Sequence, residues 1–287
     1  MLSLILVSAL LGSAASQVEV PSLDYVCPMD PEVRAALPGS CNRCGMKLVV
    51  GVADPLEYGL DLELRPRAPR PNRPVEVFFV VKEPNTGKRV QEFEIVHERP
   101  FHLFVLSESL DFFLHEHPTL GRDGRFRFTA RFPKPGMYRL LCDFYPKGGT
   151  PQMLVRTALI PGTRGLSLST LPAELTAGLT EKNGPNMAVE LDLQPRVPIA
   201  GAQTMMFFRI KPVDGFEKYL GSWSHLLASS DDLVDVIHAH PFLADGGPQV
   251  QFNMIFPRAR SYRLWAQFQR KGVVNTVVFD VTVSELQ

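Results

Sequence analysis

The chain has 287 residues, of which 45% are apolar, so it is long enough to bury more than one hydrophobic core. Its 30 Lys and Arg residues balance its 30 Asp and Glu residues, and the formal net charge is zero. The chain therefore lacks the basic field that recruits nucleic acid or anionic lipid, and we expect no nucleic-acid partner.

The N-terminus has the pattern of an export signal. Residues 2–11 form an apolar run, and the small residues 12–16 that follow suit a signal peptidase. The run is too short to cross a bilayer, and no later stretch reaches the roughly 18 to 20 apolar residues of a transmembrane helix. We predict a signal peptide over 1–16, a periplasmic or secreted protein and no transmembrane span. No Lys or Arg precedes the run, and the alternative is a short buried N-terminal strand.

A small cysteine-bearing segment follows, over residues 22–50. It contains three of the four cysteines, Cys27, Cys41 and Cys44, whereas Cys142 lies far along the chain. An odd cluster of three in an exported chain indicates metal or redox chemistry rather than a disulfide framework. The segment is too small to fold on an apolar core alone, so a metal or a neighbouring domain must help it.

The donor groups of this segment favour a soft metal ion. Cys41 and Cys44, on a glycine-containing turn, can present two sulfurs to one ion, and Cys27 adds a third. Met29 and Met46 each follow a cysteine by two residues, so a thioether could close the shell. Thiolate and thioether ligands select Cu(I), which is the cofactor predicted for this segment. The alternatives are a Cys41–Cys44 disulfide with Cys27 free, or a purely structural knuckle.

The order of these residues resembles a known family. Tyr-x-Cys-Pro-Met at 25–29, Pro-Gly-x-Cys-x-x-Cys-Gly-Met at 38–46 and the final Leu48 are similar to the heavy-metal-binding domain, a module found at the ends of copper and silver efflux adaptors and of some heavy-metal-transporting ATPases. The resemblance implies metal binding. The family usually has His where this chain has Asp30, which removes a nitrogen donor but could supply oxygen to Zn(II).

From residue 57 onward the pattern is typical of strands. Short β-branched or aromatic runs are separated by Pro and Gly turns, and 125–132 alternates charged residues with Phe, as a half-buried strand does. The strand candidates before the linker are 75–81, 101–106, 125–132 and 152–160. We predict an all-β protein in which 57–161 and 172–287 are two immunoglobulin-like β-sandwiches. Only 171–179 has a weak helical pattern.

The two predicted sandwiches are copies of one sequence. An offset of 129 residues aligns 62–69 with 191–198, and offsets of 123 and 124 align the later segments. Self-similarity of this kind indicates two homologous domains. The alignment places Ala266 opposite Cys142 and Gln267 opposite Asp143.

Six of the seven histidines repeat with the duplication. Each repeat carries one histidine and then, 13 residues later, a His-x-His-Pro sequence; the residues are His102, His115, His117, His225, His238 and His240. Residues i and i+2 of a strand face one side. Antiparallel pairing centred near 108–109 predicts that His102 lies opposite His115 and His225 opposite His238. Three imidazoles on one face could bind Cu(II) or Zn(II) with water or a carboxylate, and Asp143 is the carboxylate available in the first repeat.

Other interpretations of these residues remain open. The six histidines could be packing residues at a sandwich rim. His97 has no counterpart in the second repeat, and we expect it on the surface. Cys142 follows an apolar run, which favours a buried inert thiol, although Cys142 and Met153 give a faint indication of a blue-copper site.

The first repeat resembles a second family. The segments 101–110, 115–118 and 138–144 look like a family of exported β-sandwich domains found beside heavy-metal genes. The resemblance supports the fold and the compartment rather than a particular chemistry.

The prediction for the whole protein is an exported heavy-metal-binding protein, with copper as the expected metal, that acts in metal sequestration, delivery or resistance. We identify no catalytic residue. The expected partners are metal ions, with a metal efflux system or a metal-accepting protein as the candidate protein partner. The alternatives are a mononuclear copper or zinc enzyme that uses a three-histidine site, and a non-catalytic adhesive or scaffold protein whose histidines are structural.

Overall fold

The computed structural model describes residues 24–27, 33–42, 45–51, 57–163, 165 and 171–286. The secondary structure over these ranges is all strand, which confirms the predicted fold class. Accordingly, the described chain has no helix long and apolar enough to cross a bilayer. The predicted signal peptide, Met29 and Cys44 lie outside the described residues.

The cysteine-bearing segment forms a small sheet of its own, which we call the N-terminal module. Its strands are β1 (Asp24–Val26), β2 (Arg34–Ala35) and β3 (Val49–Gly51), in the order β2-β1-β3. The hydroxyl of Tyr145, in the first repeat, donates to the carbonyl oxygen of Val50 at 3.4 Å. The module therefore rests on the first repeat.

The first repeat is a two-sheet sandwich. Its strands are β4 (Gly59–Arg65), β5 (Pro74–Lys82), β6 (Phe101–Ser107), β7 (Phe113–Glu116), β8 (Thr119–Leu120), β9 (Phe126–Arg131), β10 (Gly136–Phe144) and β11 (Gln152–Ile160). The antiparallel sheets have the orders β4-β5-β9-β8 and β11-β10-β6-β7. This connectivity is that of an immunoglobulin-like domain with β7 as an additional strand: strands A, B, E and D (β4, β5, β9 and β8) share one sheet, and C, F and G (β6, β10 and β11) lie in the other. Phe79, Phe101 and Phe126 lie in its core.

The second repeat has the same plan. Its strands are β12 (Lys182–Asn183), β13 (Ala188–Gln194), β14 (Gln203–Lys211), β15 (Phe216–Glu217), β16 (His225–Ser230), β17 (Val236–Ala239), β18 (Gln249–Ile255), β19 (Ser261–Arg270) and β20 (Val273–Thr282). One sheet has the order β12-β13-β14-β18; in the other, β15-β19-β16-β17, strand β20 also pairs with β19. Strands β16 and β19 thus correspond to β6 and β10. The stretch 171–179 contains no helix, so that weak reading of the sequence was wrong.

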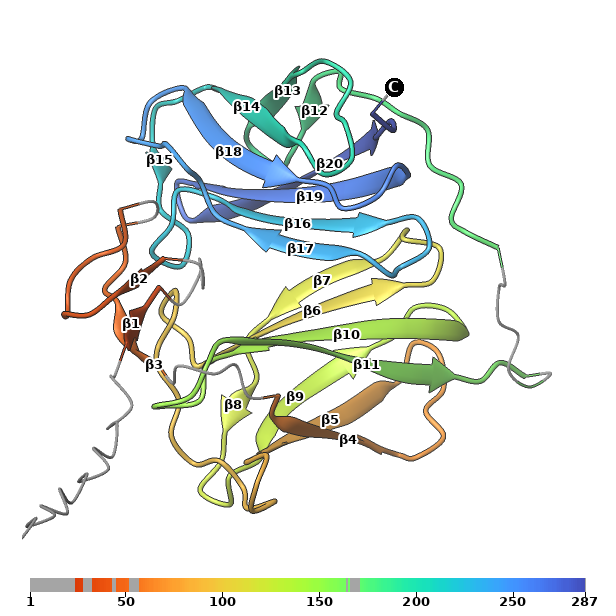
Figure 1. Ribbon diagram of the computed structural model, residues 1–287. Helices are drawn as coiled ribbons and strands as arrows, with labels where there is room; N and C mark the ends of the chain where they lie inside the picture. The colour runs from red at the N-terminus through yellow and green to blue at the C-terminus, as the bar shows by residue number, and fades with distance from the viewer. Residues whose placement is uncertain are drawn as a thin grey trace, which may run out of the picture.

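The two sandwiches pack face to face through the sheets that contain β6 and β16, as Figure 1 shows. Their contact is a hydrophobic cluster of its own, which we call the inter-repeat core. It contains Phe104 and Leu141 from the first repeat and Leu227 and Trp265 from the second. The Phe113 and Trp265 rings stack with centroids 5.2 Å apart. Strands β6 and β16 are buried on both faces for this reason, which accounts for the unbroken apolar runs 103–106 and 226–228 within them.

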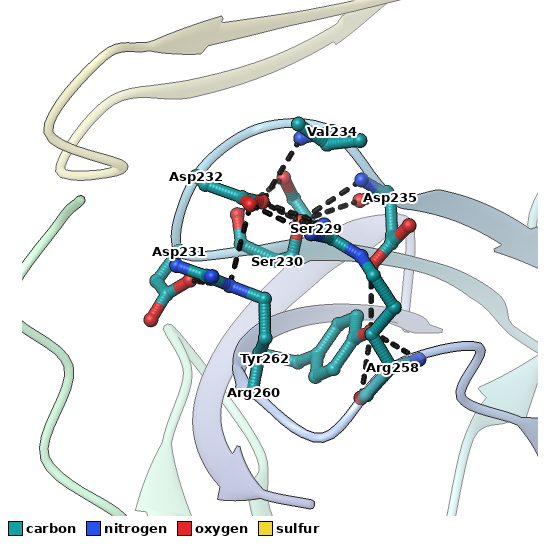
Figure 2. A network of polar contacts seen from close by, with 9 residues as sticks. All are labelled: Ser229, Ser230, Asp231, Asp232, Val234, Asp235, Arg258, Arg260 and Tyr262. Carbon is teal, nitrogen blue, oxygen red and sulfur yellow. Dashed lines mark hydrogen bonds and ion pairs between the residues drawn. The ribbon is translucent and has the colours of Figure 1, made fainter. Parts of the chain in front are cut away.

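The β16–β17 hairpin is fixed at its turn by the ionic network in Figure 2. The Arg258 guanidinium donates to Asp235 at 2.8 Å and to Asp232 at 2.9 Å. The Tyr262 hydroxyl donates to Asp235 at 2.7 Å and lies 3.1 Å from the carbonyl of Arg258. Tyr138 makes the corresponding bond to the carbonyl of Lys134 at 2.9 Å. Both are tyrosine corners, in which a tyrosine near the start of strand F, here β10 or β19, binds back to the upstream backbone.

The register of the two hairpins differs from the predicted one by two residues. Phe104 pairs with His115 and Leu227 with His238, so the connections are centred later than expected. His102 and His225 therefore lie opposite the last histidine of each motif rather than opposite the first. A shift of two residues leaves every side chain on its predicted face, because side chains alternate with period two.

Candidate metal centre

All seven histidines gather at one end of the inter-repeat contact. They lie at the start of β6 and of β16, at the ends of β7 and β17 and, for His97, in the turn before β6. The alternation of each strand turns its apolar partners into the sandwich cores and its histidines toward the opposite repeat. In Figure 1 the N-terminal module lies at this same end, whereas the turn of Figure 2 lies at the other.

The first cluster consists of His102, His115 and His117. Their ligand atoms lie within 4.8 Å of one another. The Nδ1 atom of His102 is 3.3 Å from Nε2 of His115 and 3.2 Å from Nε2 of His117. The remaining nitrogen of His102 donates to the carbonyl of Val96 at 2.9 Å. The structure therefore brings together the three histidines expected in the first repeat.

The second cluster has a membership that differs from the expected one. The ligand atoms of His225, His240 and His97 lie within 4.8 Å of one another. Nε2 of His240 is 2.9 Å from Nδ1 of His225, whose other nitrogen donates to the carbonyl of Tyr219 at 2.9 Å. His238 lies at its edge, with its ring 4.6 Å from that of His240 and 6.1 Å from that of His225.

His97 is half-buried and stacks on His240, with ring centroids 3.9 Å apart. The expectation that it lies on the surface was wrong. Its turn corresponds to the one at Leu220, since both residues have positive φ and each precedes the first histidine of its repeat, His102 or His225, by the same number of residues. Because the second repeat has Leu220 at the equivalent position, comparison of the two repeats could not identify His97 as a candidate ligand. The reason for its burial is the docking of the second repeat on this turn.

Two histidines receive a hydrogen-bond partner from the opposite repeat. Nδ1 of His115 donates to Oε1 of Gln267 at 2.6 Å, and Nδ1 of His238 donates to Oδ2 of Asp143 at 2.7 Å. Asp143 and Gln267 occupy equivalent positions, each paired in register with the first histidine of its own repeat. Asp143 thus supports the second repeat's histidine, rather than serving the first cluster. Such partners fix the ring orientation of metal-binding histidines.

The cluster favours neutral imidazoles, which are the form that binds metals. Burial lowers the pKa of His97 to about 3 and that of His102 to about 4. Burial also lowers the pKa of His117 to about 3, and His102 beside it adds to that effect. The pKa values of His225 and His240 are lowered by burial and by the neighbouring imidazoles. At neutral pH the nitrogens therefore present lone pairs to one another.

Several of these lone pairs have no hydrogen-bond partner. Among the described residues, six buried side-chain nitrogen or oxygen atoms lack one, and three belong to this centre: Nε2 of His97, Nε2 of His238 and Nδ1 of His240. Leaving a buried polar group unsatisfied costs about 1 to 3 kcal/mol. A cation bound by these nitrogens would remove the cost, so the donor set fits a metal ion.

The N-terminal module brings two of its predicted ligands together. Cys27 and Cys41 are buried and belong to one cluster with Leu48. The amide of Cys41 donates to the carbonyl of Met46 at 2.7 Å, and the amide of Gly45 donates to the carbonyl of Cys41 at 2.9 Å. Gly45 has a φ of 73°, which favours glycine in this turn. The chain therefore folds back between Cys41 and Met46, and the backbones of these two predicted ligands are hydrogen-bonded to each other.

Cys142 does not take part in either site. It is fully buried in the core of the first sandwich, on the face of β10 opposite Asp143, and burial raises its pKa well above the ordinary value. Met153 packs instead toward the inter-repeat core. The expected burial of this thiol is confirmed, and the two residues lie on opposite sides of the sheet rather than converging as a blue-copper site requires.

Comparison with known proteins gives a family for the repeats and one for the module. The heavy metal binding domain family matches residues 25–49 and confirms the resemblance at family level. A search of curated proteins found no match.

Similar solved structures include the Escherichia coli adhesin FdeC, with 12% identity over 83% of this chain and 68% of that chain, at a TM-score of 0.27. They also include a mutant Salmonella alpha-2-macroglobulin, with 12% identity over 81% of this chain and a TM-score of 0.25. This chain spans 15% of the macroglobulin chain. TM-scores this low carry no functional inference.

The sandwiches themselves match one family twice, over residues 56–158 and 181–285. The chain therefore belongs to the family described as a domain of unknown function, DUF8832, of which it contains two copies behind a heavy metal binding domain.

Proposed function

We propose that this protein is an exported copper-binding protein that sequesters or delivers the metal as part of heavy-metal resistance. The N-terminal module would hold Cu(I) through Cys27, Cys41 and Cys44 with thioether support, and the histidines would hold Cu(II) or Zn(II). The family match of the module supports heavy-metal binding. The choice of copper rests on its soft sulfur donors.

The observation that carries the proposal is the convergence of lone pairs in the first cluster. Because His102 donates its proton to Val96 and His115 donates its proton to Gln267, the nitrogens that face each other at 3.3 Å are both acceptors. Two facing lone pairs repel unless a proton or a metal ion lies between them. Burial opposes the proton by lowering the pKa of both rings, and a metal ion is the remaining occupant.

The position of the module supports delivery between the two kinds of site. Met46 and Val49 line one groove together with Glu94 and Ile95 of the first repeat. His97 follows Ile95 by two residues. The groove therefore reaches the turn that carries His97, and this turn is the route by which ligand exchange would pass an ion from the module to the imidazoles.

The test is a metal titration with stoichiometry. Purified mature protein is titrated with Cu(I) under anaerobic conditions and with Cu(II) and Zn(II), in parallel with the variant C27S/C41S/C44S. We expect the variant to lose Cu(I) binding at the module and to retain Cu(II) or Zn(II) binding at the histidines. The matched control is C142S, which removes the remaining thiol and should bind as the parent does.

Failure of both the parent and the variant to bind any of the three ions above background would overturn the proposal. Sustained redox turnover by the copper-loaded protein would instead favour an enzyme with an open three-histidine site. Histidines that remain metal-free while the module binds one Cu(I) would limit the function to the module.

A further inference from the structure

The two histidine clusters are built by both repeats. His97 belongs to the first repeat by sequence, yet its ligand atom lies with those of His225 and His240 in the second. The pairs His115–Gln267 and His238–Asp143 cross the same boundary in opposite directions. Each cluster therefore depends on the opposite repeat, either for a ligand or for a group that orients one of its rings.

The clusters are also adjacent. The ring centroids of His102 and His225 are 6.4 Å apart, and those of His115 and His225 are 5.8 Å apart. His102 and His225 are almost fully buried, with 2% and 1% of their surface exposed. Two ions bound here would lie in one desolvated region between the sheets.

We propose that the seven histidines form a single dinuclear metal centre that joins the two repeats, with His97 as a ligand donated by the first repeat to the ion of the second. This rests on the proposed metal binding at the histidines. The ligand class is a pair of imidazole-preferring ions, copper or zinc. Occupation of the centre ties the two sandwiches together, because the ion of the second cluster takes ligands from both repeats. In the first cluster, Gln267 of the second repeat orients one of the ligands.

The two halves of the centre differ in charge. Asp143, a carboxylate, supports His238, whereas the neutral amide of Gln267 supports His115. A carboxylate partner raises the basicity of a ligating histidine, and His97 adds a donor to the same half. The ion of the second cluster therefore binds first and more tightly.

The experiment uses the full mature chain carrying C27S/C41S/C44S, so that the module does not compete for the metal. The probe is Cu(II), followed by calorimetry and by electron paramagnetic resonance. His97→Leu installs the residue that the second repeat has at the equivalent position. The matched control is Glu98→Gly, which likewise installs the second repeat's residue in the same turn, since Gly221 is its counterpart and both positions have positive φ.

We expect the parent to bind two Cu(II) ions whose spectra show dipolar broadening and a half-field transition, and whose binding raises the Tm of unfolding in two steps. His97→Leu should weaken the tighter equivalent by at least about tenfold and reduce its step in Tm. Glu98→Gly should bind as the parent does. His97→Gln, which keeps a polar side chain, guards against misfolding and should behave as His97→Leu does.

Two ions with magnetically isolated signals would overturn the dinuclear centre, as would a single ion. Unchanged affinities in both His97 variants would overturn the role of His97. If the cysteine variant binds no Cu(II) while the intact chain binds Cu(I), the dinuclear centre fails but heavy-metal binding by the module stands.

Discussion

At the scale of single residues, the structure assigns different tasks to chemically similar side chains. Asp143 and Gln267 occupy equivalent positions in the two repeats, and each orients a histidine of the other repeat. One substitution in the duplication therefore makes the two halves of the centre electrostatically unequal. This difference in charge comes from the hydrogen-bond partners of the histidines, and the groups that would bind the metal are imidazole nitrogens in both halves.

Exchanging these partners tests their role. Asp143→Asn keeps the shape of the side chain but removes its charge, and we expect it to weaken metal binding at the second cluster about 10-fold to 100-fold. Gln267→Glu should strengthen binding at the first cluster, because it gives His115 a carboxylate. Isothermal titration with Zn(II) measures both. Equal losses at both clusters for Asp143→Asn would contradict the assignment and indicate a general loss of structure.

Cys142 provides a contrast, because its role is packing. Cys142→Ala installs the residue that the second repeat has at the equivalent position, and we expect a loss of about 1 kcal/mol in the free energy of unfolding from the missing sulfur. Copper stoichiometry should not change. Urea denaturation and metal titration of the same preparation check the two expectations, and a lost ion would show that the thiol binds metal.

At the scale of secondary-structure elements, the hairpins that carry the histidines are anchored at the opposite end. In the second repeat Arg258 and Tyr262 bind the turn carboxylates, and in the first repeat Lys134 forms an ion pair with Asp111. Because the anchors fix the turns, they also fix which strand residues face each other at the histidine end. The register of β7 and β17 depends on contacts located a full strand away.

The two tyrosine corners allow a matched comparison. Each tyrosine hydroxyl accepts from a backbone amide and donates one hydrogen bond, which Tyr262→Phe removes from the Asp235 carboxylate and Tyr138→Phe from the Lys134 carbonyl. We expect a loss of about 2 kcal/mol for Tyr262→Phe and about 1 kcal/mol for Tyr138→Phe, since bonds to charged groups contribute more. Urea denaturation of the metal-free proteins measures this difference. A larger loss for Tyr138→Phe would contradict the assigned role of Asp235.

At the scale of the whole molecule, the contact between the repeats has two parts. The inter-repeat core, with Phe104 and Trp265, provides apolar area, and the histidine centre beside it provides metal donors. Without metal, the second part contains buried nitrogens that lack a hydrogen-bond partner, beside the two hydrogen bonds that cross between the repeats. Metal binding should therefore stabilise the arrangement of the two sandwiches more than it stabilises either one.

The metal-free protein should lose stability as the pH falls below about 6.5, the ordinary pKa of histidine. Burial lowers the pKa of His102 to about 4 in the folded state, so the unfolded state binds more protons between these values. Below about pH 6.5 each further unit then removes about 1 kcal/mol for such a histidine, until the folded pKa is reached. Urea denaturation at pH 7.5, 6.0 and 5.0 measures this, and a pH-independent midpoint would contradict it.

Much of the fold could be predicted from the sequence because its signals are local. The strands at 75–81, 101–106 and 152–160 appear nearly as expected, since alternation and β-branched residues act within a few residues. The duplication predicted two similar sandwiches. The hairpin register was predicted two residues short, because the length and path of a turn such as 108–112 depend on contacts that the pattern of the strands does not encode.

The sequence by itself determined which side chains could be ligands: the spacing of His115 and His117, and of His238 and His240, places each pair on one strand face whatever the rest of the molecule does. It likewise determined the module, through its ordered cysteines. Only the tertiary structure decided that His97 joins His225 and His240, and that Asp143 and Gln267 serve the opposite repeats. These groups are separated by more than ninety residues, and the docking of two buried sheets, rather than any local periodicity, brings them together.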